Sequence, residues 1–251
     1  KEIYEDRGLK AENHLANNLV HLLPNAEIYS NVYVPTQNGT TEIDVLAVDK
    51  TGVYVFESKN MNGKILGDIE KEQWEVKYGK GLFKGNNEVQ KMYNPILQNE
   101  GHINKLKEYL NTNGVNVPRE KIHSYIYTHK TKTSIKKESH LKNEDIHLIR
   151  SKDIKYTPIT KKNNKKFKYK KMIDNVDLKA INNLIEKKSG KNVSIITKKE
   201  HIKTVKKAKK YNKNKKRKRN NLNIFENKSK NQKNKKDSKR KEGLNLWEIQ
   251  L

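Results

Sequence analysis

The chain has 251 residues, a net charge of +26 and no Cys. Without Cys it has no disulfide, thiolate metal site or Cys nucleophile, which fits a reducing compartment such as the cytoplasm. Only 33% of its residues are hydrophobic, too few for a core along the whole chain, so part of it is expected to be disordered. No apolar run approaches the roughly 20 residues of a membrane span. The chain starts at Lys1 rather than Met, which leaves room for an upstream signal or anchor.

The first predicted element is a helix from Ile3 to Leu23, because Leu9, Ala16 and Leu19 fall on one side at helical spacing. Glu12 lies on the same stripe. A carboxylate facing a core costs free energy unless it is paired or bound to a cation. The alternative is an edge position where the carboxylate reaches water. A first strand is then expected over residues 26–34.

The next predicted element is a hairpin. Residues 43–48 and 53–56 are rich in branched apolar side chains, and the segment Asp49-Lys50-Thr51-Gly52 between them is typical of a turn. With a two-residue loop, Asp49 pairs with Gly52 and Asp44 lies opposite Glu57. A three-residue loop would shift this register by one.

This register predicts a pair of facing carboxylates. Directly opposed like charges destabilise a sheet, and a divalent cation between Asp44 and Glu57 would remove that cost, because carboxylate oxygens suit Mg²⁺. Lys59 shares the face of Glu57, since side chains alternate along a strand, and would orient or activate a water. The alternative is that both carboxylates lie at strand ends in water, with Lys59 as an ordinary ion-pair partner.

Beyond the hairpin, residues 60–67 suggest a loop or short strand, residues 73–78 a strand and residues 79–87 a loop. Trp74 is expected in the core, with stacking on a base as the alternative. A second helix starts at Asn94, a good N-cap, followed by Pro95 at the first helical position. It carries Leu97 among its apolar residues.

The rest of the folded part consists of two further strands over residues 122–128 and 146–149 and a closing helix over residues 176–188. The sequence therefore predicts an α/β domain over residues 1–190, followed by a Lys- and Asn-rich, basic and disordered tail over residues 191–251. Residues 244–251 are apolar again and are candidates for docking on a partner or on the core.

The tail carries most of the charge excess. From Lys198 to Lys241, 21 residues are basic and three are acidic. Such a block repels itself and binds polyphosphate by counterion release, and a tail of this composition that only solubilises the chain is the alternative. The nucleic-acid-binding residues expected here are Lys215, Lys216, Arg217, Lys218 and Arg219.

Several motifs occur in one order along the first half of the chain. They are the segments 8–12 (GLKAE), Ile43-Asp44, 52–60 (GVYVFESKN), 63–65 (GKI) with Trp74, and 94–98 (NPILQ). This part resembles the NERD (nuclease-related) domain of the PD-(D/E)xK nuclease superfamily, with the motifs in about residues 1–112. The resemblance implies a restriction-endonuclease-like mixed sheet flanked by helices. Ile43 stands where the superfamily often has Pro before the Asp.

The resemblance also assigns roles to residues. It implies that Glu12 faces the active site and that Gln98 orients water or substrate, whereas His102 on the same helix is left as a surface or packing residue. The expected catalytic residues are Asp44, Glu57, Lys59 and Gln98, and the expected ligands of Mg²⁺ or Mn²⁺ are Asp44, Glu57 and Glu12.

The expected function is metal-dependent hydrolysis of phosphodiester bonds in nucleic acid, DNA rather than RNA, without strong sequence specificity. One alternative is a nucleic-acid-binding module with this fold and little catalysis. Another, which would rest on the tail alone, is a basic protein associated with ribosomes or a membrane surface.

Overall fold

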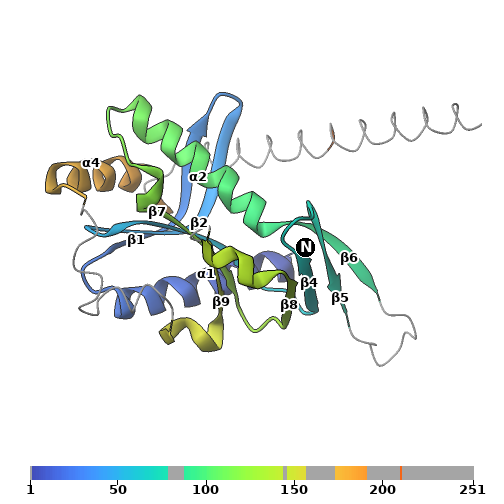
Figure 1. Ribbon diagram of the computed structural model, residues 1–251. Helices are drawn as coiled ribbons and strands as arrows, with labels where there is room; N and C mark the ends of the chain where they lie inside the picture. Colours follow the sequence, from blue (N-terminus) through green and yellow to red (C-terminus); the bar gives the residue numbers. More distant parts are fainter. Residues whose placement is uncertain (1, 79–87, 144–145, 157–172, 191–209, 211–251) are drawn as a thin grey trace, which may run out of the picture. The chain divides into compact units, whose positions relative to one another are not determined.

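A computed structural model describes residues 2–78, 88–143, 146–156, 173–190 and 210 (Figure 1). Apart from Lys210, these residues belong to one compact unit within residues 1–201. The predicted loop 79–87 and, except for Lys210, the predicted tail with Lys215, Lys216, Arg217, Lys218 and Arg219 lie outside the described residues. The domain boundary at residue 190 stays a prediction.

The main sheet has five strands in the order β1-β2-β3-β7-β9. Strands β1 to β3 pair antiparallel, and β3, β7 and β9 pair parallel, so the sheet is mixed as predicted. The strands are β1 (Glu27–Thr36), β2 (Gly39–Asp49), β3 (Gly52–Lys59), β7 (Ile122–Thr128) and β9 (Ile146–Arg150).

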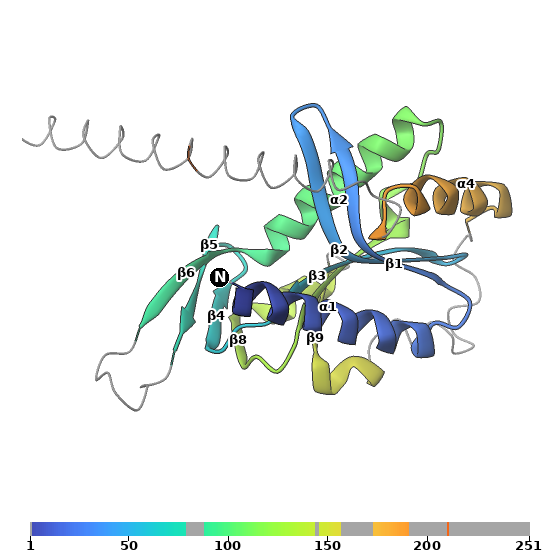
Figure 2. The same ribbon diagram turned by 180° about the vertical axis from the view of Figure 1, so that it is seen from behind.

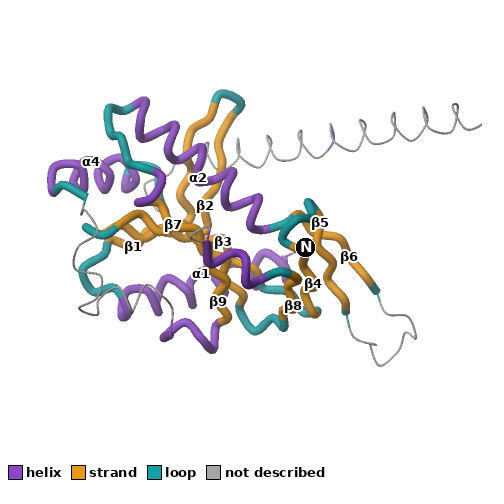
Figure 3. Tube along the Cα trace, viewed as in Figure 1, coloured by secondary structure: helices purple, strands orange, loops and turns teal. Residues whose placement is uncertain are grey.

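A second, four-stranded sheet lies beside the first (Figure 3). Its order is β6-β5-β4-β8, with β4 (Lys64–Asp68), β5 (Gln73–Lys77), β6 (Val89–Tyr93) and β8 (Thr133–Lys136). Strands β6 and β8 were not predicted. Trp74 of β5 is buried, and its indole Nε1 donates to the carbonyl of Asp68 at 2.8 Å. Trp74 is therefore a core residue, and the alternative of base stacking is wrong.

Among the described residues, three helices cover the main sheet: α1 (Glu2–Leu22), α2 (Pro95–Thr112) and α4 (Asn175–Glu186). Figures 1 and 2 show α1 on one face and α2 and α4 on the other. Short 3₁₀ turns follow at η1 (Arg119–Lys121), η2 (Glu138–Asn143) and η3 (Ser151–Tyr156). None of the described helices has the length and apolar character needed to cross a membrane.

The two faces of the sheet have separate cores. Leu15 and Leu19 of α1 pack with Val45 and Phe56, and the α2 side has its own cluster around Ile103, Leu106 and Leu110. The predicted stripe of α1 is wrong at Leu9, which is 48% exposed, and Leu97 of α2 is 41% exposed. Their neighbours Ala11 and Ile96 are buried, so each helix is covered at this level and the two leucines lie on its outward side.

The start of α2 is fixed by its cap. The Asn94 side chain accepts a hydrogen bond from Ile96 N at 2.9 Å, and Pro95 stands at the first helical position, as predicted. Asn99, one turn further, is fully buried and donates to the Val55 carbonyl at 3.0 Å and to Ser124 Oγ at 2.9 Å. It therefore ties α2 to β3 and β7.

Candidate active site

The β2–β3 hairpin has the predicted register. Asp49 pairs with Gly52, and Asp49 Oδ1 accepts hydrogen bonds from Thr51 N at 2.7 Å and Gly52 N at 3.2 Å. The paired ladder runs as far as Val45 and Phe56. One step further along the same register, Asp44 lies opposite Glu57.

The β1–β2 ladder is interrupted at the same level. Ser30 pairs with Val45 and Val32 with Ile43, but the pair between them, Asn31 and Asp44, is not formed. Asn31 has a φ of 52°, the left-handed region that Asn tolerates better than most residues. This irregular pair places the Asn31 amide and the Asp44 carboxylate at the site.

Asp44 is the first of the clustered carboxylates. Its Oδ2 accepts a hydrogen bond from Ser58 N at 2.7 Å, which anchors it to β3. Burial and the negative charges of Glu57 and Glu12 raise the pKa of Asp44 well above its usual range, against the opposing effects of Lys59 and the Ser58 hydrogen bond. Asp44 therefore carries its negative charge only at a free-energy cost.

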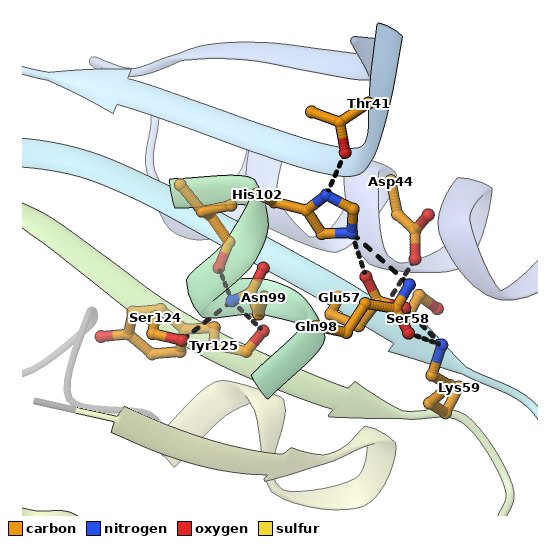
Figure 4. Close-up of polar contacts among 11 residues, drawn as sticks. Thr41, Asp44, Glu57, Ser58, Lys59, Gln98, Asn99, His102, Ser124 and Tyr125 are labelled. Carbon is orange, nitrogen blue, oxygen red and sulfur yellow. Dashed lines mark hydrogen bonds and ion pairs between the residues drawn. The ribbon is translucent and has the colours of Figure 1, made fainter. Parts of the chain in front are cut away.

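Glu57 and Lys59 form the second part of the site (Figure 4). Lys59 Nζ pairs with Glu57 Oε1, and its second partner is Gln98 Oε1 at 3.2 Å. His102 Nε2 lies 3.2 Å from Glu57 Oε2. Burial raises the pKa of Glu57, but Lys59 and His102 together outweigh it, so the pKa is lowered. Burial lowers the pKa of Lys59, yet the three carboxylates raise it overall.

Glu12 reaches the cluster from α1, on the opposite face of the sheet. Asn31 Nδ2 donates to Glu12 Oε2 at 3.0 Å. Burial raises the pKa of Glu12, as do Glu42 and Glu57, while the Asn31 hydrogen bond and Lys59 lower it, and the net shift is upward. This position agrees with the prediction that Glu12 faces the site, rather than with the alternative in which its carboxylate reaches water.

The structure thus brings together all five predicted residues of the folded part: Glu12, Asp44, Glu57, Lys59 and Gln98. It also brings in His102, which the sequence did not assign to the site: its Nε2 lies 3.2 Å from Glu57 Oε2 and its Nδ1 lies 2.7 Å from Thr41 Oγ1. Asn31 was not predicted at all. A polar residue that acts through tertiary contacts leaves no local signal, although the spacing of Gln98 and His102 by one helical turn is a usable hint.

The charge balance of the site bears on metal binding. Three carboxylates meet here, and two of them, Glu12 and Asp44, have raised pKa values. Within the described ranges, no group of three or more Asp, Glu or His side chains is arranged as a metal site. Glu57 is held instead by Lys59 and His102. The donor set fits a hard cation in chemistry, and such a cation would compete with Lys59 for Glu57.

Comparison with known proteins identifies the family. Residues 7–129 match the family model described as nuclease-related domain (NERD). This range includes Glu12, Asp44, Glu57, Lys59, Gln98 and His102. An uncharacterized protein of Bacillus anthracis is 36% identical over 81 residues, which are 32% of this chain and 35% of that protein. The chain thus spans about a third of the length of this curated relative.

One solved structure also matches, a crystal structure of a protein of unknown function. It shares 17% sequence identity, covers 55% of this chain and 58% of its own, and has a TM-score of 0.29. The family match rests on the sequence, and the mixed sheet with Asp44, Glu57 and Lys59 at adjacent strands is consistent with the PD-(D/E)xK superfamily. Over residues 7–129, the chain belongs to the nuclease-related domain family.

Proposed function

We propose that this chain is a metal-dependent nuclease that hydrolyses phosphodiester bonds, with DNA as the preferred substrate and without strong sequence specificity. The supporting observation is the meeting of Asp44 and Glu57 with Lys59 on adjacent strands, beneath two polar side chains of α2. Facing carboxylates destabilise a fold unless a cation joins them. Their position together in a nuclease-related domain supports a metal site.

Asp44 and Glu57 would hold Mg²⁺ or Mn²⁺, with Glu12 binding directly or through a water. When bound, the metal lowers the pKa of a water ligand and stabilises charge on the phosphoryl group. Binding would also lower the pKa values of Asp44 and Glu12, because the cation replaces carboxylate repulsion with attraction. Activity should therefore increase with pH over the range in which these two carboxylates lose their protons.

Lys59 has a defined part in this proposal. In the metal-free site the three carboxylates raise its pKa against the effect of burial, so Lys59 is protonated there at neutral pH. It would donate a hydrogen bond to the attacking water or to a phosphate oxygen and offset negative charge there. Gln98 would hold the ammonium group in place, since its Oε1 already accepts from Lys59.

The test is cleavage of plasmid DNA and of a structured RNA in Mg²⁺, in Mn²⁺ and in EDTA. Glu57→Gln keeps the size of the side chain but removes its charge, and we expect metal-dependent cutting to fall by at least about 100-fold, as for losses of catalytic metal ligands and their neighbours. Glu108→Gln, on the exposed face of α2, is the matched control. Equal cutting by both variants would overturn the proposal.

A second candidate function is a nucleic-acid-binding module with little catalysis. The observation in its favour is that Lys59 already pairs with Glu57 and compensates its charge, which leaves less need for a metal. Absence of cutting in every condition, together with tight and salt-sensitive binding by wild type and Glu57→Gln alike, would support this function.

A further inference from the structure

A basic pocket lies beside the candidate active site. Its volume is about 820 Å³. It is lined by the first part of α1, the segment after β3, strands β4 and β5, and the turn between β7 and β8. Of the described residues that line it, none is Asp or Glu, and six are cationic: Arg7, Lys10, Lys64, Lys77, Lys130 and Lys132.

Three of these lysines form a row across adjacent strands. Lys64 of β4 is paired directly with Lys77 of β5 in the antiparallel ladder. On the other side of β4, Ile65 N donates to the carbonyl of Lys132 at 2.8 Å, and Ile65 pairs with Thr133, so Lys132 flanks Lys64. Like charges directly opposite each other destabilise a sheet. An anion bound along the row would remove that repulsion.

The positive charges of the lysine row are not compensated by carboxylates of the described residues. All three lysines are exposed, and among the described residues none of them forms an ion pair with a carboxylate, whereas Lys105, Arg119 and Lys137 elsewhere do. The backbone at the pocket is also closely packed, because a Cβ on Gly63 would lie 2.6 Å from the Lys77 carbonyl oxygen. The three charges are therefore presented to the pocket by a well-defined wall.

The pocket begins where the candidate active site ends. Asn60, directly after Lys59, lines the pocket and donates to the Arg7 carbonyl at 2.9 Å. His129, also in the lining, donates its backbone N–H to the Lys59 carbonyl at 3.0 Å. Both residues follow the carboxyl ends of parallel strands β3 and β7, the edge at which α/β sheets usually bind ligands.

A second hollow of about 550 Å³ shares Lys64, Lys130 and Lys132 with the basic pocket and adds Lys152 and Arg150, the latter paired with Glu138 at 3.3 Å. The two hollows together form a cationic path. Each falls within the range of about 300–1,000 Å³ that is usual for sites of small ligands. A pocket of this size has room for a few nucleotides of one strand. The half-buried Tyr78, which lines the basic pocket, would provide an aromatic surface for a base.

We propose that the basic pocket binds the phosphates of a single-stranded nucleic-acid segment, which it guides into the site at Asp44 and Glu57. This inference rests on the proposed function, but it places substrate contacts in the folded domain rather than in the tail. The lysine row holds consecutive phosphates of the strand. The enzyme then acts on single strands or frayed ends in preference to closed duplexes.

The test measures binding of a labelled single strand to the full chain in EDTA, by anisotropy over a range of salt concentrations. The pocket variant is Lys64→Gln/Lys77→Gln/Lys132→Gln, and the control variant, with equal charge loss at exposed sites outside the pocket, is Lys50→Gln/Lys71→Gln/Lys179→Gln. Each phosphate contact to a single strand contributes about 0.7 to the log–log salt slope, so the pocket variant should lose about 2 and the control almost nothing. Equal loss in both variants would refute the pocket.

Two further arms identify the ligand. For a closed duplex, the salt slope of binding should fall between the wild type and the pocket variant by less than half as much as it does for the single strand. Inorganic phosphate at matched ionic strength should not displace the single strand from the wild type. Equal losses with the duplex, or displacement by phosphate, would overturn the single-strand proposal. Because no metal or cleavage is involved, a failed nuclease assay with Glu57→Gln leaves this result unaffected.

A single charge reversal separates binding from folding. Lys77→Glu places a carboxylate opposite Lys64, so it should raise Tm while it weakens binding of the single strand. An unfolded variant would lose both. Unchanged binding with a raised Tm would contradict the proposal.

Discussion

His102 Nε2 of α2 lies 3.2 Å from Glu57 Oε2 of β3, and the opposite ring nitrogen lies 2.7 Å from Thr41 Oγ1 of β2. The imidazole thus joins three elements at the most buried carboxylate of the site (Figure 4). When Thr41 donates its hydroxyl hydrogen to Nδ1, Nε2 carries the ring hydrogen, and this nitrogen lies 3.2 Å from Glu57 Oε2 and 3.4 Å from Gln98 Nε2. This orientation is typical of residues that position a metal-binding carboxylate.

Replacing His102 by Gln should therefore move the pH profile of cleavage. Burial raises the pKa of Glu57, whereas Lys59 and His102 lower it, so loss of His102 raises the pKa. Glu57 should then titrate together with Asp44 and Glu12 on the acid limb of kcat/KM against pH, so the limb should shift to higher pH, with a decrease of about 10–100-fold on that limb, the usual cost of losing such a neighbour. Thr41→Val should give a smaller shift in the same direction.

The control is His21→Gln, at an exposed position near the end of α1, which should leave the profile unchanged. An acid limb that stays in place in His102→Gln would show that His102 does not tune Glu57. A uniform loss at all pH values would point to a structural role instead.

Asp44→Asn should stabilise the fold and abolish cleavage. The folded pKa of Asp44 is raised above the unfolded value by burial and by Glu57, so stability is greatest when Asp44 is protonated and falls as pH rises through the folded pKa. Asn has no charge and keeps an acceptor for Ser58 N. We expect a gain of about 0.5–2 kcal/mol above that pKa, as for other stabilising changes at functional sites, seen as a higher Tm.

Metal binding at Asp44 can be tested by comparing the wild type with Asp44→Asn and with the control Glu108→Gln. Mg²⁺ or Mn²⁺ at about 100 times its Kd should stabilise the wild type by about 2.7 kcal/mol through preferential binding to the folded state. Asp44→Asn should show little of this gain, and Glu108→Gln should show all of it. Equal stabilisation of the three proteins would mean that the ion binds elsewhere.

The hairpin could be predicted because its signals are local. The turn at Asp49 fixes the register, and alternation along β3 then sets Glu57 and Lys59 on one face. Strands β6 and β8 have no such pattern. Residues 89–93 are mostly exposed and do not alternate between apolar and polar side chains, and they form a strand because β5 offers them a partner edge. Their structure depends on tertiary pairing rather than propensity.

The site residues also divide into those with a local sequence signal and those that depend on tertiary contacts. Asp44, Glu57 and Lys59 came from strand register, and Gln98 came from a family motif. Asn31 and Asn99 were missed because each acts across the fold, Asn31 on Glu12 of α1 and Asn99 on β3 and β7. Asn31 has no local signal, whereas Asn99 lies on the apolar stripe of α2 between Ile96 and Ile103, a position that helical spacing could have identified.

Asn31 can be tested by a pair of substitutions. Asn31→Gly keeps the left-handed backbone and removes the amide, so it should cost little stability while it raises the pKa of Glu12, whose hydrogen bond with Asn31 lowers it. We expect metal affinity to fall by about 10–100-fold, measured by titration calorimetry. Asn31→Ala should lose the same affinity and, in addition, about 1 kcal/mol of stability at φ 52°. Wild-type affinity in Asn31→Gly would exclude a role for Asn31 at the metal.

Gly67 of β4 fixes the packing of the second sheet against its own core. A Cβ at this position would lie 2.7 Å from Trp74 Cδ2 and 2.7 Å from Ile135 Cδ1, and Trp74 cannot retreat, because it is buried and hydrogen-bonded to the Asp68 carbonyl. Gly67→Ala should therefore destabilise the protein by about 1–3 kcal/mol through overpacking, measured by denaturant unfolding.

Gly101→Ala is the same substitution as Gly67→Ala, but we expect it to stabilise the protein. No heavy atom lies within 4 Å of a Cβ added there, and Ala in the interior of α2 is favoured over Gly by about 0.5–1 kcal/mol. Opposite signs at the two glycines would show that contact with Trp74, and not the loss of backbone freedom, decides the result at Gly67. If Gly67→Ala also stabilised the protein, the β4–β5 wall of the basic pocket would be looser than its contacts indicate.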